Sequence, residues 1–252
     1  MGRQTLGIWI PTWNRPGFFN RLIESIEPQL HPDLTVACGI NGITDEYRLP
    51  EWVQQTINPS NIGQSLNILL GINQLDTDYI WILGDDEQVK PGGIAEVIER
   101  IQGHPGMVIC TDGRFDHGPE GDYPTWIDWA DACVNTGRGV MLTAQTLISS
   151  TVFWRPGMDM STAYSYLNSK YGHHFGFLAG LMRDRVTVTR RPVFTAGHNT
   201  DSHIHYEDFE VRSTHGPICQ ASLRHLIAWI NEKADRSYDT DACYTPGVGF
   251  DS

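Results

Sequence analysis

Apolar positions in the first half of the chain follow two periods, one typical of buried strands and one of amphipathic helices. Short apolar runs bounded by Gly, Pro or polar residues predict strands, and spacings of three and four predict helices. The expected order is strand Leu6–Ile10, helix Gly17–Ile26, strand Leu34–Ile40, a loop or helix through Trp52, strand Thr56–Ile57, helix Ile62–Gln74, strand Tyr79–Leu83, helix Gly92–Ile101 and strand Met107–Cys110. This alternation predicts an α/β fold, a mostly parallel sheet flanked by helices on both faces.

Beyond Asp112 the pattern is less regular. The expected elements are the stretch Trp126–Cys133, strand Ile148–Trp154, helices Ser161–Tyr166 and Phe175–Met182, strand Val186–Val188 and helix Ile218–Ile230. No repeat, linker or low-complexity tract separates the two halves, so we expect a single domain over residues 1–235. Residues 113–235 would complete the sheet and build an acceptor or lid surface, and residues 236–252 would form a tail.

Composition narrows the class of protein. The chain has 252 residues with 30 acidic and 18 basic side chains, and the formal net charge of −12 argues against a surface that wraps nucleic acid. Its apolar runs are far shorter than the roughly 20 residues of a membrane span, and no signal-peptide pattern follows Met1. We therefore expect a cytoplasmic protein without a transmembrane segment.

The sharpest chemical signal is a run of three acids, Asp85-Asp86-Glu87, that follows a buried strand and Gly84. Adjacent carboxylates repel one another and lose hydration when they are partly buried, unless a cation relieves the repulsion. Hard oxygen ligands suit Mg²⁺ or Mn²⁺, and ligands of open α/β sheets bind outside the carboxyl ends of the strands. The alternative is a solvated acidic turn, stabilised by the helix that begins near Gly92.

Small and polar residues also stand at the ends of other predicted strands or the starts of helices. They occur in the segments Ile8–Pro16, Ile40–Asp45 and Asn61–Asn67. Backbone N–H groups and side chains at such positions can hold a nucleotide diphosphate.

Four segments in this order resemble the family-2 glycosyltransferases of the GT-A fold, especially the abequosyltransferase-like bacterial sugar transferases. The segments are Pro11-Thr12-Trp13-Asn14-Arg15-Pro16, Asn41-Gly42-Ile43-Thr44-Asp45, Asn61-Ile62-Gly63, and Trp81-Ile82-Leu83-Gly84-Asp85-Asp86-Glu87 followed by Pro91-Gly92. Each segment is weak alone, and together they cover about residues 6 to 110. The resemblance implies a Rossmann-type GT-A-like sheet in which residues 1–112 bind a nucleotide sugar.

The resemblance also implies roles for individual residues. Asp86 would be the main ligand of Mn²⁺ or Mg²⁺ and the central catalytic group, and Asp85 would contact the ribose or the metal. Glu87 would be a second ligand or would hold a water molecule. The implied donor-binding set consists of Pro11, Thr12, Asn14, Arg15, Asn41, Asn61, Gly63 and Asp85. The metal would act as a Lewis acid on the departing diphosphate.

Two departures from the family pattern affect specificity and catalysis. Ile40-Asn41 stands where the family usually has an acid that recognises the base, which leaves the donor base open. The family's inverting members usually carry a Glu-Asp pair near the position of His173-His174, so the expected carboxylate base is missing there.

Histidines offer replacements for the missing groups. His174 or His173 could deprotonate an acceptor hydroxyl, or both could simply pack or cap the helix that follows. His198 would be a third metal ligand by analogy with the wider fold, against a solvated loop as the alternative. Asp208 is the nearest carboxylate that could serve as the base, with a surface charge as the alternative.

The predicted function is therefore metal-dependent transfer of a sugar from a nucleotide-diphosphate donor to an acceptor hydroxyl. The acceptor would be a glycan, a lipid-linked molecule or another hydroxyl compound, and a nucleic-acid acceptor stays open. One alternative is a degenerate module that binds nucleotide sugars without catalysis. Another is a sugar-nucleotide nucleotidyltransferase, which is disfavoured because Pro11–Pro16 is not a Gly-rich basic loop.

Overall fold

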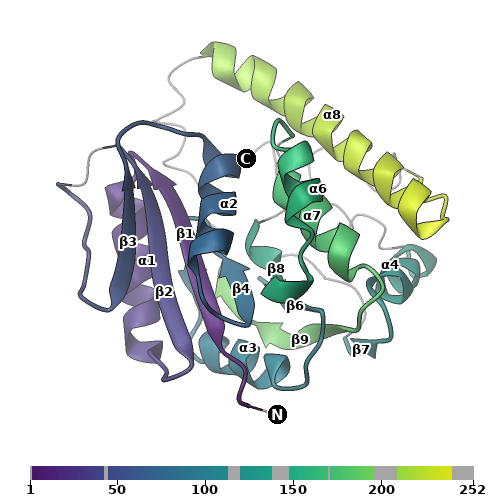
Figure 1. The fold of residues 1–252 in the computed structure, drawn as a ribbon, viewed down its shortest axis with the longest axis horizontal. Helices are drawn as coiled ribbons and strands as arrows, with labels where there is room; N and C mark the ends of the chain where they lie inside the picture. The colour runs from purple at the N-terminus through teal and green to yellow at the C-terminus, as the bar shows by residue number, and fades with distance from the viewer. Residues whose placement is uncertain are drawn as a thin grey trace.

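The computed structural model describes residues 2–42, 45–112, 120–137, 148–169, 171–195 and 209–239. Its centre is an eight-stranded sheet with the strand order β3-β2-β1-β4-β8-β6-β9-β7 (Figure 1). The strands are β1 (Leu6–Trp13), β2 (Leu34–Asn41), β3 (Val53–Asn58), β4 (Tyr79–Ile82), β6 (Met107–Thr111), β7 (Asp122–Tyr123), β8 (Thr151–Trp154) and β9 (Val186–Pro192). A second, two-stranded sheet pairs β5 (Gln88–Val89) with β10 (Phe194–Thr195).

The main sheet is mostly parallel. Strands β3, β2, β1 and β4 run parallel to one another, and β6 runs parallel to β9. Strand β8 is antiparallel to both β4 and β6, and β7 is antiparallel to β9 at the edge. The carboxyl ends of β1, β2, β3 and β4 therefore meet at one edge of the sheet.

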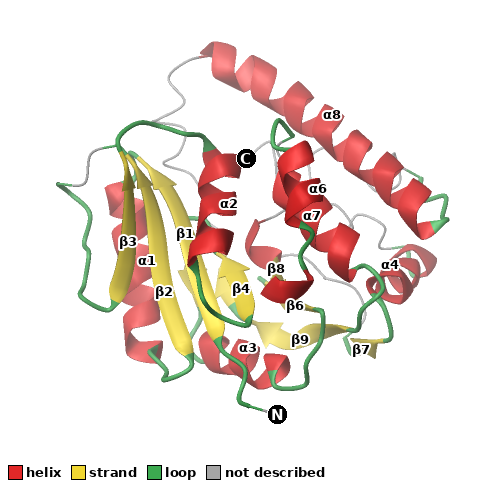
Figure 2. Ribbon diagram, viewed as in Figure 1, coloured by secondary structure: helices red, strands yellow, loops and turns green. Residues whose placement is uncertain are grey.

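Helices cover both faces of this sheet (Figure 2). One face packs against α1 (Pro16–Ile26) and α3 (Gly93–Ile101). The other face packs against α2 (Gln64–Gln74), α4 (Trp126–Asn135), α6 (Met160–Ser165), α7 (Gly172–Leu181) and α8 (Phe209–Ala234). Strand β1 supplies both cores by alternation, because Ile8 and Ile10 face α1 and α3 while Trp9 faces α2.

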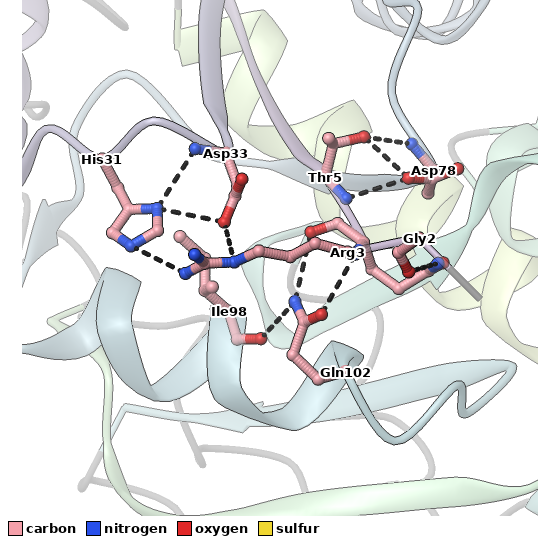
Figure 3. A network of polar contacts seen from close by, with 9 residues as sticks. Gly2, Arg3, Thr5, His31, Asp33, Asp78, Ile98 and Gln102 are labelled. Atoms are coloured by element: carbon pink, nitrogen blue, oxygen red, sulfur yellow. Dashed lines mark hydrogen bonds and ion pairs between the residues drawn. The ribbon is translucent and has the colours of Figure 1, made fainter.

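The opposite, amino edge of the sheet is fastened by polar contacts (Figure 3). The Asp78 carboxylate accepts hydrogen bonds from Thr5 N at 2.9 Å and Thr5 Oγ1 at 2.8 Å, just before β4 and β1 begin. Arg3 pairs with Asp33 ahead of β2, and the Gln102 amide donates to the carbonyl of Gln4. These contacts fix the starts of three strands far from the carboxyl edge.

The predicted architecture is confirmed, and the differences lie at element boundaries. Strand β1 continues to Trp13, three residues past the expected end, because residues beyond Trp9 still pair with β2. Pro11, which has no N–H, fits this stretch since β1 there has only one partner strand. The described residues 45–52 hold no helix, and the expected strand Ile148–Trp154 begins as a 3-10 turn, Ile148–Ser150.

The C-terminal helix α8 is longer than expected, beginning at Phe209 rather than at Ile218. Helix α7 begins at Gly172, so His173 and His174 lie in its first turn instead of ahead of it. Within the described ranges, no helix combines the length and apolar character needed to cross a lipid bilayer.

Candidate functional site

The carboxyl ends of β1 and β4 bring the acidic turn and the Thr12–Arg15 segment into contact. The guanidinium of Arg15 donates from Nη1 to Asp85 Oδ1 and from Nη2 to Asp86 Oδ2, each at 2.8 Å. The Thr12 hydroxyl donates to the other Asp85 oxygen, Oδ2, at 2.7 Å. Two sequence segments about 70 residues apart therefore form one polar centre, as expected for neighbouring parallel strands.

Local backbone geometry places Arg15 at this centre. Asn14 adopts a left-handed conformation with φ of 53°, which asparagine tolerates better than most residues, and this turns the chain between β1 and α1. Arg15 then stands at the N-cap of α1, where its carbonyl accepts from Phe19 N, and Pro16 follows at the first helical position. The Arg15 side chain therefore extends from a short turn whose backbone is fixed by the start of α1.

Tyr47 joins this centre from the loop after β2. Its hydroxyl accepts from Arg15 N at 3.0 Å and lies 3.2 Å from Thr12 Oγ1. Because Thr12 donates its own proton to Asp85, the Tyr47 hydroxyl donates to Thr12. The hydrogen bonds therefore run in one direction, from Arg15 N through Tyr47 and Thr12 to the carboxylate of Asp85.

The environment of Asp85 opposes its ionisation. The residue is 4% exposed, and burial raises the pKa of its carboxyl to about 6 even though the Arg15 charge and the Thr12 hydrogen bond lower it. The nearby Asp86 charge contributes to the increase. A cation beside Asp85 favours its ionised form, and Arg15 supplies that positive charge here.

The Glu87 side chain points into the protein and not toward Arg15, which pairs with Asp85 and Asp86. Its Oε2 accepts hydrogen bonds from Gly84 N at 3.1 Å and from the Ser149 hydroxyl. Complete burial, together with the charges of Asp86, Asp85 and Asp112, raises the pKa of Glu87 well above its usual range. This arrangement favours a role for Glu87 in shaping the turn over its predicted role as a metal ligand.

Amide side chains surround the neighbouring ends of β2 and β3. Asn41 Nδ2 donates to Asn61 Oδ1 at 3.0 Å, and Asn41 Oδ1 accepts from Asn58 at 3.0 Å and Asn67 at 3.2 Å. Asn61 also accepts from Gly63 N at 2.9 Å, which shapes the start of α2. The predicted residues Asn41, Asn61 and Gly63 therefore form one amide cluster without a carboxylate.

A cavity of about 320 Å³ opens beside this cluster. It lies between the start of α2, including Gly63, Gln64 and Ser65, and residues 167–169 of the second half. The two walls are joined where the Ser65 hydroxyl donates to the Ser169 carbonyl at 3.2 Å. The cavity is therefore shared by both halves of the chain.

The two candidate histidines are buried in the first turn of α7. His173 is 4% exposed and His174 is 2% exposed, and their ring centroids are 4.2 Å apart. Burial and the neighbouring His174 lower the pKa of His173 well below its usual value. This placement favours packing over proton transfer to a solvent-borne acceptor, whereas His198 and Asp208 lie outside the described residues.

Several contributors to the site were missed by sequence reasoning. Tyr47 and Asn58 come from segments without a distinctive pattern. Ser149 lies in the expected strand Ile148–Trp154, and Asn67 ends the highlighted segment Asn61–Asn67, but neither was given a role. Asp112 is 1% exposed and directly follows the buried strand β6, a signal that could have been recognised.

The two paired acids have the ligand chemistry of a divalent-cation site. Asp85 and Asp86 offer the hard oxygen ligands that Mg²⁺ and Mn²⁺ prefer, and the Asp86 side chain is 24% exposed. Across the described part of the chain, no group of three or more His, Cys, Asp or Glu side chains is arranged so that it could hold a metal ion by itself. The ligand chemistry fits, and the Arg15 guanidinium now occupies the position between the two carboxylates.

Comparison with known proteins gives matches at three levels. The sequence model of a family described as glycosyl transferase family 2 matches residues 8–184, well over half of the chain. Abequosyltransferase RfbV of Salmonella typhimurium strain LT2 is 25% identical over 112 residues, which is 40% of this chain and 34% of that protein. The match therefore spans about a third of the curated relative's length.

Solved structures share the fold over most of the chain. TarS 1-349 of S. aureus in complex with UDP-GlcNAc has a TM-score of 0.60 at 10% identity, covering 90% of this chain and 66% of that one. Mannosyltransferase PcManGT from Pyrobaculum calidifontis, in complex with GDP-Man and Mn²⁺, has a TM-score of 0.56 at 12% identity, covering 90% and 65%. At such identities the likeness concerns the GT-A fold alone.

Proposed function

This chain belongs to glycosyl transferase family 2, and we propose that it moves a sugar from a nucleotide-diphosphate donor to an acceptor hydroxyl. In this proposal a divalent cation binds at Asp85 and Asp86. The observation that carries the proposal is the meeting of Thr12, Arg15, Asp85 and Asp86 at the carboxyl ends of β1 and β4. Support also comes from the two structural neighbours, which are complexes with UDP-GlcNAc in one case and with GDP-Man and Mn²⁺ in the other.

Each described residue has a part in this proposal. Asp86, the more exposed of the two paired acids, is the main ligand, and Asp85 is the second. A divalent ion bound there would supply Lewis acidity that stabilises the departing diphosphate. Thr12 and Tyr47 hold Asp85 in place, and Glu87 with Ser149 keeps the turn in shape.

The amide cluster is the proposed place for the donor's base and ribose. Asn41, Asn61 and Asn58 can each donate and accept hydrogen bonds, and they lie at the ends of β2 and β3 and just before α2. Pro11, Asn14 and Gly63 contribute backbone close to that position. Since one neighbour is in complex with a uridine donor and the other with a guanosine donor, the base stays open for this chain.

The acceptor and the general base that would deprotonate it are less closely defined. A glycan, a lipid-linked molecule or another hydroxyl compound stays the proposed acceptor class. The burial of His173 and His174 argues against either as the general base, and Asp208 stays a prediction, as does His198 as a third ligand. The cytoplasmic location likewise stays a prediction.

A binding experiment tests the donor site. The full chain and Asp86→Asn are titrated with UDP, GDP and their common sugar conjugates, with and without Mn²⁺, by calorimetry and thermal shift. We expect Mn²⁺-dependent binding of one nucleotide family, weakened at least about tenfold in the variant because a charged ligand oxygen is lost. A nucleotide at about 100 times its dissociation constant stabilises the fold by roughly 2.7 kcal/mol, enough for a clear melting shift.

The matched control is Asp76→Asn, which neutralises a fully exposed carboxylate paired with Arg155 on another part of the surface. It should bind nucleotides like the unmodified chain. The donor-site proposal is wrong if no nucleotide binds the folded chain, or if Asp86→Asn binds as tightly as the control.

A further inference from the structure

The positive charge between the carboxylates of Asp85 and Asp86 is the Arg15 side chain. The forked guanidinium of Arg15 reaches Asp85 with one nitrogen and Asp86 with the other, both at 2.8 Å. The Arg15 side chain is 29% exposed, against 5% for Asp85, so the ion pair is partly screened from water. These are the two carboxylates to which the proposed function assigns a divalent ion.

Arg15 and a divalent ion would compete for these carboxylates. Asp85 Oδ1 accepts from Arg15, Asp85 Oδ2 accepts from Thr12, and Asp86 Oδ2 accepts from Arg15. Two cations drawn to the same pair of carboxylates in a partly buried site repel each other. Binding of an ion therefore opposes the Arg15 ion pair.

We propose that Arg15 is a tethered counter-ion that a divalent cation must displace, so that this residue sets the metal affinity of the nucleotide-free protein. The inference rests on the proposed function, since it takes Asp85 and Asp86 as the ion's ligands. It assigns Arg15 a competing role in the empty site, in addition to its predicted place among the donor-binding residues.

The surroundings of Arg15 allow the side chain to move while its backbone stays fixed. Its N–H donates to Tyr47 and its carbonyl accepts from Phe19 N at the start of α1, and neither bond involves the guanidinium. The Phe18 ring already lies 4.8 Å from the guanidinium carbon and offers a face on which a displaced cation can rest.

Displacement would also couple the ion to an anionic donor. A guanidinium released from the two acids is a bidentate partner for phosphate oxygens. A diphosphate that pairs with the released Arg15 favours the displaced state and thereby tightens ion binding, and the ion tightens diphosphate binding by the same factor. Arg15 would therefore make the two ligands bind cooperatively.

The primary test measures Mn²⁺ binding to the nucleotide-free full chain by the electron paramagnetic resonance signal of free Mn²⁺. Arg15→Gln removes the competing charge, and we expect it to bind Mn²⁺ at least about tenfold more tightly than the unmodified chain. Arg21→Gln is the matched control, because Arg21 also lies over the Phe18 ring, at 4.6 Å, and has no place in the site. Its Mn²⁺ affinity should not change.

A second measurement uses a variant that keeps the charge. Arg15→Lys cannot span both carboxylates with a single ammonium group, so we expect its Mn²⁺ affinity to rise by less than that of Arg15→Gln. Adding UDP or GDP, whichever binds, should tighten Mn²⁺ binding more in the unmodified chain than in Arg15→Gln. This smaller coupling is a readout that a purely structural role would not change.

The outcomes separate this inference from the proposed function. If nucleotides bind with Mn²⁺ and depend on Asp86, but both Arg15 variants bind Mn²⁺ no more tightly than the Arg21 control, only the counter-ion role is overturned. If neither the unmodified chain nor any folded variant binds Mn²⁺ at millimolar concentration, with or without nucleotide, the proposed function fails and the inference fails with it.

Discussion

Three adjacent acids have three different environments in the folded chain. Asp86 keeps a quarter of its side-chain surface exposed, Asp85 is enclosed by Arg15 and Thr12, and Glu87 points into the protein toward Ser149. The sequence Asp85-Asp86-Glu87 makes these residues look equivalent, and only their partners distinguish them. At the scale of the residue, burial and neighbours decide which acid can meet an ion.

The same principle applies to His173. Neither of its ring nitrogens has a hydrogen-bond partner among the described residues, and burial lowers its pKa well below the usual value near 6.5. The folded state therefore holds the neutral ring, whereas the unfolded chain takes up a proton below about pH 6.5. Stability contributed by this group is present above that pH and is lost as the pH falls.

We expect His173→Leu to lose less stability in acid than the unmodified chain. The difference in unfolding free energy between pH 7.5 and 5.5 should shrink by up to about 1.4 kcal/mol, since one proton would no longer bind preferentially to the unfolded state. Urea unfolding at several pH values measures it. His104→Asn, at an exposed position with a left-handed φ of 56°, is the control. An equal effect in both variants would contradict the assignment.

At the scale of the element, close approach between β1 and α2 supports the carboxyl edge. The Trp9 indole lies against Gly71 of α2, and its Nε1 donates to Asn67 Oδ1 at 3.2 Å. Asn67 in turn donates to Gly39 O and to Asn41. Packing of one helix on two strands therefore fixes the orientation of the amide cluster.

We expect Gly71→Ala to destabilise the protein by about 2 kcal/mol or more. A Cβ at Gly71 would lie 2.1 Å from a Trp9 ring atom, so the helix or the indole must shift, despite the gain of about 1 kcal/mol in helix propensity. Gly17→Ala in α1 is the control, because no atom lies within 4 Å of its Cβ. Thermal unfolding should show a lower melting temperature for the first variant and an equal or higher one for the second.

At the scale of the whole molecule, the two halves share one sheet. Strand β8 of the second half lies between β4 and β6 of the first, and β6 has β8 and β9 as its two neighbours. Residues 1–112 therefore contain most of the candidate site, but they lack both partners of β6. We therefore do not expect either of the two predicted halves to fold independently.

We expect a fragment of residues 1–112 to show no cooperative thermal transition by circular dichroism. Without β8 and β9 the apolar residues of β6, and the face of the sheet normally covered by α7 and α8, would be exposed to water. The full chain, measured under the same conditions, should melt in one step. A fragment that unfolds cooperatively would show that the second half is an addition to an autonomous domain.

Local patterns by themselves determined the fold class and the main chemical signal of this protein. The alternation of strand and helix periods predicts the parallel sheet with helices on both faces, because each element must bury its apolar side. The strand-end pattern singled out the acidic turn and the segment Ile8–Pro16, and the family resemblance implied Thr12, Arg15, Asp85 and Asp86 as site residues. These four residues meet at the carboxyl ends of β1 and β4. Such features depend on neighbours in the chain, which a sequence displays directly.

Only the tertiary structure decided which partners these residues have. Tyr47 and Ser149 reach the site from distant segments, Arg15 stands where the sequence suggested only a metal ion, and His173 is enclosed in a core rather than exposed to an acceptor. Burial and ion pairing arise from contacts between residues far apart in the chain. The physical state of each group is therefore set by packing, which no single segment specifies.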